Sequence, residues 1–321
     1  MLWMAQRIHT PPAASAKPRY RVTNWRDYDR ALVARGSITL WIDEEVLAGW
    51  RATSGNGLRY SAAAMLCALS LRAVFRLPLR QTQGFLLSLK RLLGLTIDIP
   101  HYSSFCRRAA ALDVPQFTHP ATGGPLHLAI DSTGLEVHGE GEWKARTHGK
   151  DGRRVWRKLH LGIDTATGEI PAHALTSSEI HDGAELPGLL EQVGGPIAAV
   201  YADKACDSFG IHRAILARKA RPVIPPRNGA AIRPPPRLKD TPPTRGAAVA
   251  RIAEIGRKAW KEATGYHRRS LAETGVARYK TIIGPGLRAR TFTNQKAEAA
   301  IGVRCINSFT APGMPVSVKI T

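Results

Sequence analysis

The sequence has few cysteines, few acidic residues for its number of basic ones, and no long apolar run. The cysteines Cys67, Cys106, Cys206 and Cys305 form no C-x-x-C pair and no cluster with histidines, which excludes a typical zinc site and a disulfide framework. We therefore expect a reducing compartment, the cytoplasm. The most apolar stretch, residues 61–75, contains Arg72, so no membrane-spanning helix and no membrane partner is predicted.

The shortage of acid is the strongest compositional signal. There are 25 acidic residues against 46 Lys and Arg, which gives a net charge of +21 and a pI near 10.5. Such a surface attracts phosphates, so nucleic acid is the first candidate partner. A chain of 321 residues, of which 44% are hydrophobic, can form about two folded domains. Residues 1–20 lack the pattern of a signal peptide and are predicted to be a disordered tail.

Residues 21–120 are predicted to form an all-helical DNA-binding region. Apolar residues recur at helical spacing from Trp25 to Leu112, and Ser103 is a suitable N-cap for the last helix. That helix ends in basic residues, Arg107 and Arg108, which we expect to contact DNA. Short helices joined by tight turns resemble a helix-turn-helix reader of DNA. A plain helical bundle with a solvated basic face fits the same pattern.

After residue 121 the spacing of apolar residues changes from about 3.6 residues, as in helices, to 2 residues, as in strands. Residues 125–133 and 196–205 are buried strands that end near Asp131 and Asp203, and three further strands and two helices lie between or after them. Three antiparallel strands, a helix, a parallel strand, a helix and a last strand make a mixed α/β sheet. This order predicts a ribonuclease-H-like domain over residues 121–315.

Residues 221–246 interrupt this domain with eight of the 22 prolines and with five arginines. Proline blocks helix and donates no hydrogen bond, so the segment is predicted to be an irregular loop. It is either a solvated connector or a contact for a phosphate backbone. The helical pattern resumes from Ala247 and continues to Lys280.

Carboxylates on this fold are the candidate catalytic groups. Because adjacent parallel strands end at one edge, Asp131 and Asp203 should lie side by side and repel each other unless a cation lies between them. Mg²⁺ prefers such oxygen ligands, and a third carboxylate on a helix would complete the site. The remaining candidates are interpreted as turn-formers or helix caps: Asp164, Asp182 and Asp207.

The stretch "GYHRRSLAETGVARYK" supplies the third carboxylate. At about 100° per residue, Tyr266, Arg269, Glu273 and Lys280 share one helical stripe. An ion pair between Arg269 and Glu273, four residues apart, is the simpler explanation and would only support the helix. The spacing of the four residues is also the Y-x2-R-x3-E-x6-K signature of bacterial insertion-sequence DDE transposases.

The resemblance extends from about residue 25 to residue 315. The stretches "LAIDSTGLEVHGEGEW", "THGKDGRRVWRKLHLGIDTATGEI" and "YADKACDS" are similar to transposases of insertion-sequence family five. The resemblance implies that Asp131, Asp203 and Glu273 are the catalytic triad and hold two divalent ions, Mg²⁺ or alternatively Mn²⁺. It implies DNA contacts by four further residues: Tyr266, Arg269, Lys280 and Lys158. His160 also matches the family's motif, and we expect a structural role for it.

The resemblance further implies a partner and a reaction. The partner is DNA, both the terminal inverted repeats and the target, with a homodimer in the DNA complex and a location at the nucleoid of a bacterial cytoplasm. The reaction is cleavage of the transposon ends and joining of the 3′-OH to target DNA. A purely hydrolytic nuclease of the same fold and a non-catalytic, transposase-derived DNA-binding protein are the alternatives.

Overall fold

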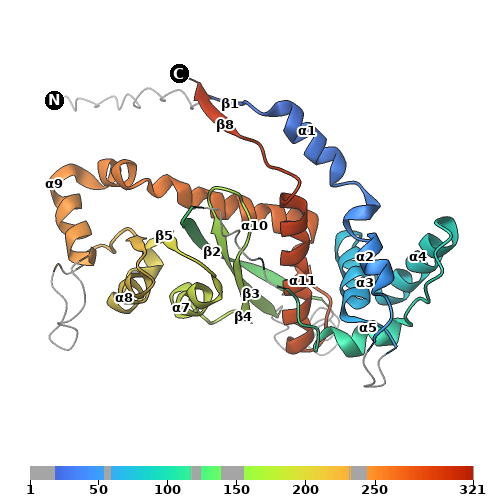
Figure 1. Cartoon of the computed structure of the whole chain (residues 1–321). Helices are drawn as coiled ribbons and strands as arrows, with labels where there is room; N and C mark the ends of the chain where they lie inside the picture. Colours follow the sequence, from blue (N-terminus) through green and yellow to red (C-terminus); the bar gives the residue numbers. More distant parts are fainter. Residues whose placement is uncertain are drawn as a thin grey trace, which may run out of the picture.

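The computed structural model describes residues 19–53, 59–115, 117, 124–138, 155–230, 232 and 244–320. A helical part comes first in the chain, and a mixed sheet covered by helices follows it (Figure 1). This confirms the predicted fold class. The helical part contains α1 (Trp25–Ala34), η1 (Ile38–Leu40), α2 (Glu44–Ala48), α3 (Ala62–Val74), α4 (Leu79–Leu92) and α5 (Tyr102–Ala109).

Helices α3 and α4 meet at an angle of 109° across a short turn. Most of α3 is buried because its residues are almost all apolar, whereas α4 exposes Arg80, Gln81 and Arg91. Angles of about 90–120° across a short turn also occur in helix-turn-helix pairs. Together the pair has the length and composition of a bent membrane span, but no single helix in the described part of the chain could cross a membrane.

The mixed sheet has the strand order β4-β3-β2-β5-β6. Strand β3 runs antiparallel to β2 and β4, whereas β5 and β6 run parallel to β2. This is the ribonuclease-H-like order that the sequence predicted. The strands are β2 (Leu126–Val137), β3 (Trp156–Asp164), β4 (Ala172–Ser177), β5 (Ile197–Tyr201), β6 (Arg221–Val223) and the short β7 (Gly286–Leu287), which pairs with the end of β2.

Helices cover both faces of the sheet. On one face, β2 residues such as Leu128 pack against α7 (Asp182–Gln192) and α8 (Phe209–Ala217). On the other, residues such as Ala129 pack with α9 (Thr244–Thr264), α10 (Ser270–Ile282) and α11 (Phe292–Thr310). Side chains alternate along a strand, so Asp131 shares the face of Ala129 and is directed towards the side of α10.

The expectation that Asp131 ends a strand is wrong. Strand β2 continues six residues beyond it to Val137, because β3 pairs with β2 along this length and β7 pairs with its end. The parallel neighbour β5 is shorter and stops at Tyr201, which pairs with Ala129. Asp131 therefore lies in mid-strand, at the level where pairing with β5 has ended.

The helical part and the sheet domain share a hydrophobic core. Residues of α3 such as Met65 and Leu69 pack in one cluster with Ile301, Cys305 and Phe309 of α11. In addition, β1 (Arg19–Val22) pairs with β8 (Ser317–Ile320), so segments from the two ends of the chain lie side by side (Figure 1). The tail boundary expected at residue 20 falls inside β1, and residues 1–18 lie outside the described residues.

The single helix expected from Ala247 to Lys280 is interrupted. Gly256 and Gly265 have positive φ angles of 82° and 69°, a conformation that glycine adopts without steric strain. After Gly265 the chain forms a short 3₁₀ helix, η4 (Tyr266–Arg269), and only then α10. Tyr266 and Arg269 are therefore in a separate turn from Glu273. Of the proline- and arginine-rich segment, residues 231 and 233–243 lie outside the described residues.

Gly275 lets α10 approach the sheet closely. A Cβ at this position would lie 2.3 Å from Cδ1 of the buried Ile163 on β3. We expect Gly275→Ala to lower stability by about 1–3 kcal/mol through overpacking, although alanine alone favours helix by about 1 kcal/mol. Thermal unfolding measures this. Gly188→Ala in α7 is the matched control, because its Cβ would meet nothing within 4 Å; an equal effect in both variants would contradict the close approach.

Candidate active site

Asp131 and Asp203 come from neighbouring strands. Tyr201, the last residue of β5, pairs with Ala129 of β2, and Asp203 and Asp131 each follow these paired residues by two positions. The Asp131 carboxylate accepts a hydrogen bond of 3.0 Å from the Ser132 amide. Asp203 caps the turn that follows β5 by accepting a 2.8 Å bond from the Ala205 amide. The backbone therefore orients both carboxylates.

Arg269 joins two of the predicted carboxylates. Its guanidinium lies 2.7 Å from Oε1 of Glu273 and 3.3 Å from Oδ2 of Asp131. The Arg269 side chain is 19% exposed and that of Asp131 20%, whereas Glu273 is 62% exposed. The expected ion pair with Glu273 is present, but Arg269 also connects α10 to β2. Its positive charge therefore lies between the two carboxylates.

Electrostatic interactions connect Tyr266 to the same group. Burial raises the pKa of the Tyr266 phenol, Arg269 opposes this, and the negative charges of Asp203, Asp131 and Glu273 raise it further. Burial likewise raises the pKa of Asp131, and the Arg269 guanidinium partly offsets this. All three carboxylates are thus within electrostatic range of one phenol.

The carboxylates suit a hard cation by their chemistry. Three carboxylates from adjacent elements are oxygen ligands of the kind that Mg²⁺ takes. Within the part of the chain that the structure describes, however, no group of at least three His, Cys, Asp or Glu side chains converges closely enough to hold an ion. Asp131 and Glu273 instead contact the guanidinium of Arg269. Its positive charge offsets the repulsion between the two carboxylates.

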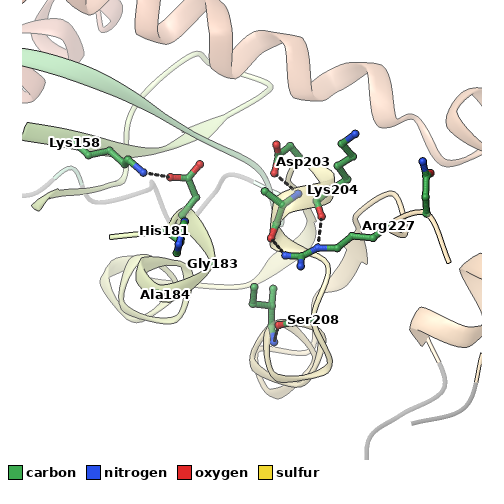
Figure 2. A pocket seen from close by; sticks show the side chains of 12 residues that line it. Lys158, His181, Gly183, Ala184, Asp203, Lys204, Ser208 and Arg227 are labelled. Atoms are coloured by element: carbon green, nitrogen blue, oxygen red, sulfur yellow. Dashed lines mark hydrogen bonds and ion pairs between the residues drawn. The ribbon is translucent and has the colours of Figure 1, made fainter. Parts of the chain in front are cut away.

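Two cavities adjoin Asp203. One, of about 360 Å³, extends to Tyr266 and Arg269 and is lined by three further cations, Lys204, Arg257 and Lys261. The other, of about 760 Å³, lies between the starts of α7 and α8 and is drawn in Figure 2. Asp203, Lys204 and Asn228 line both cavities. Asp203 therefore lies between two cavities that are lined by basic side chains. Such cavities attract the phosphates of a polyanion.

The family of the chain follows from its sequence match. Residues 122–309, more than half of the chain, match the family model described as the transposase DDE domain, and residues 33–140 match a second model of the same description. The chain belongs to the DDE transposases. It is also similar to the piggyBac transposase in a cryo-EM structure of its synaptic complex with hairpin DNA, at 12% identity and a TM-score of 0.37, over 87% of this chain and 74% of that chain.

This DDE transposase has a further carboxylate that the sequence interpretation treated as a cap. Asp182 begins α7, but its carboxylate lies 3.3 Å from Nδ1 of His160 and 3.8 Å from Nζ of Lys158. Burial raises the pKa of Asp182, but the His160 ring and the Ser132 hydroxyl outweigh it, so this pKa is lower than usual. Asp182 therefore connects α7 to β3 and to the residue that follows Asp131. Its place in the sequence, at the start of a helix, gave no signal of this contact.

His160 and Lys158 of the transposase are held by protein groups. His160 is fully buried, and its Nε2 lies 2.9 Å from the Thr176 hydroxyl, as fits a structural histidine. The Lys158 ammonium donates a 2.8 Å bond to the Ile180 carbonyl and lines the larger cavity. Lys158, a predicted DNA contact, thus lies beside the larger cavity, but its ammonium is held by α7 and by the loop before it.

The remaining predicted DNA-binding residues lie apart from the carboxylates. Lys280 follows Glu273 by seven residues on α10, about 10 Å along the helix, and is half-buried. Arg107 is exposed at the end of α5, in the helical part. Its neighbour Arg108 donates a hydrogen bond to the Tyr60 carbonyl. The Arg108 side chain therefore connects α5 to the residues before α3.

Proposed function

We propose that this protein is the transposase of a bacterial insertion sequence of the family-five type, with Asp131, Asp203 and Glu273 as its catalytic triad. It binds the terminal inverted repeats, cleaves the transposon ends and joins the 3′-OH to target DNA. The observation that supports the proposal is the position of Arg269, which contacts Asp131 and Glu273 and lines one cavity with Asp203.

The triad would hold the divalent cations of this chemistry. Asp131, Asp203 and Glu273 would bind Mg²⁺ or Mn²⁺, two ions by analogy with the family, which when bound activate water and stabilise the leaving oxygen. The cations of the protein itself hold and orient the DNA strand. Arg269 suits a bidentate phosphate contact; Lys204 and Lys261, which line the same cavity, and Lys280 on α10 act as point charges. Positioning and charge stabilisation thus provide the catalysis.

The helical part is the proposed reader of the terminal repeats. Helix α4 follows the 109° turn and exposes Arg80, Gln81 and Arg91, which is how a recognition helix is presented to the major groove. Arg107 on α5 supplies a flanking phosphate contact. We propose a homodimer in the DNA complex, in which each copy holds one end, and a location at the bacterial nucleoid.

A strand-transfer assay tests this function. Purified protein, Mg²⁺ and a duplex that carries the element's own ends should give nicked ends and then products joined to a target plasmid. Cleavage without joined products would favour the hydrolytic nuclease. Specific binding without cleavage, in Mg²⁺ and in Mn²⁺, would favour the non-catalytic DNA-binding protein.

Variants of Arg269 and Lys280 test whether these residues bind the transposon end. We expect Arg269→Ala to weaken transposon-end binding about tenfold or more, since a hydrogen bond to a charged group contributes about 1.5–3 kcal/mol. We expect Lys280→Ala to weaken binding less, because it removes a single point charge. Fluorescence anisotropy with labelled ends measures both effects.

The competing explanation is that Arg269 only supports the helix by pairing with Glu273 and Asp131. Arg269→Ala would then lower the melting temperature and leave end binding unchanged. Arg251→Ala is the matched control, because Arg251 pairs with Glu254 on the exposed surface of α9. Weakened end binding in the control as well would show a general charge effect.

A further inference from the structure

A buried carboxylate lies four residues after Asp203. The side chain of Asp207 is 0% exposed, and its two oxygens form a bidentate pair with Arg245 at 2.7 and 2.9 Å. Oδ2 of Asp207 also accepts a 2.9 Å bond from the Arg227 amide. The sequence interpretation of Asp207 is a turn-former or helix cap, and it is the C-cap residue of the short 3₁₀ helix η2 (Lys204–Cys206), whereas Ser208 is the N-cap of α8. Its side chain also connects the turn after β5 to Arg227 and Arg245, which lie near the two ends of the proline- and arginine-rich segment.

The side chain of Arg227 forms hydrogen bonds with the backbone of the same turn. Its guanidinium donates hydrogen bonds to the carbonyls of Lys204 and Ala205, the two residues that follow Asp203 (Figure 2). The Ala205 amide in turn bonds to the Asp203 carboxylate. A continuous chain of contacts thus leads from Arg245 through Asp207 and Arg227 to Asp203.

Neighbouring groups keep Asp207 ionised. Burial raises its pKa, but His212, the Arg245 guanidinium and the Arg227 amide outweigh it, and the pKa falls well below the usual range. His212 also contacts the Thr244 hydroxyl at 3.1 Å, at the start of α9. An ion pair buried in this way often gives no more stability than apolar residues would. What it does impose is a fixed geometry on the turn, because a bidentate fork allows one relative orientation.

We propose that Asp207 is a positioning residue for Asp203, and that with Arg245 and Arg227 it fixes the turn after β5. This inference rests on the proposed role of Asp203 in the active site. Carboxylates that bind a metal are themselves held by outer hydrogen bonds, and loss of such a partner typically reduces metal affinity or activity 10- to 100-fold.

Asp207→Asn tests the inference, with Glu298→Gln as the matched control. Glu298 is a largely buried carboxylate, with 14% of its side chain exposed, that accepts hydrogen bonds from two backbone amides and pairs with Arg72, but it lies on α11. At a temperature where both variants are folded, we expect Asp207→Asn to lose 10- to 100-fold in the cleavage rate at saturating DNA. We also expect about tenfold weaker Mn²⁺ binding by calorimetry, with end affinity unchanged. Glu298→Gln should keep the rate and the Mn²⁺ affinity.

Arg227→Met provides a second variant should Asp207→Asn fail to fold. Its control is Arg218→Met, since Arg218 likewise donates to two backbone carbonyls, of Val193 and Gly195, in the loop before β5. Arg227→Met should reduce the saturated cleavage rate and the Mn²⁺ affinity, and Arg218→Met should change neither.

The outcomes separate the two proposals. If Asp203→Asn abolishes cleavage and Mn²⁺ binding but the Asp207 and Arg227 variants match their controls, the positioning role is overturned and the active site stands. If Asp203→Asn cleaves like the wild type, the assignment of Asp203 fails, and the positioning role falls with it.

Discussion

Replacement of Asp131 or Asp203 by Asn, or of Glu273 by Gln, is expected to reduce transposon-end cleavage at least about a thousandfold, which corresponds to about 4 kcal/mol of transition-state stabilisation. Each change removes one proposed oxygen ligand for a divalent ion and leaves the size of the side chain unchanged. Cleavage of a labelled transposon end at saturating DNA measures the loss.

DNA binding should survive these substitutions. None of them removes a cation, and each removes one negative charge; in the Asp131 and Glu273 variants Arg269 also loses a partner. End affinity measured without divalent metal is therefore expected to be unchanged or higher. Glu254→Gln on the exposed surface of α9 is the control carboxylate and should cleave normally. Near wild-type cleavage by any one triad variant would remove that residue from the assignment.

Binding to DNA is expected to weaken steeply with salt. The net charge of +21 predicts that phosphates are neutralised and counterions released, with a log–log slope of about −0.9 for each phosphate contacted. If about six phosphates are contacted, affinity falls about a thousandfold between 50 and 200 mM salt. Titration of a labelled transposon end over this range, without divalent metal, measures the slope.

Variants that each remove one basic side chain measure how much that residue contributes to the slope. Arg269 and Lys261 line the cavity beside Asp203, and loss of one phosphate contact should reduce the slope by about 1. Arg30→Ala is the control, since Arg30 pairs with Asp27 on α1. A slope near zero for the wild type would show that the basic surface does not bind the DNA backbone.

Much of the sheet could be predicted from the sequence because the signals are local. Apolar period two marks the strands, and the order of strands and helices along the chain limits the sheet to few topologies. The boundaries were less predictable. β2 is longer than its apolar run indicates, because β3 and β7 pair with residues beyond Asp131. Gly256 and Gly265 interrupt a helix whose apolar spacing continues across them.

The sequence by itself determined the fold class, the basic character of the protein and the identity of the candidate carboxylates, because each depends on residue type and spacing. The tertiary structure alone decided which charges meet. Arg269 reaches Asp131, Asp182 reaches His160, and Asp207 reaches Arg245. These partners are 22 to 138 positions apart in the sequence. The strength of an ion pair depends on the distance between the charges and on their burial, and only the folded chain provides both.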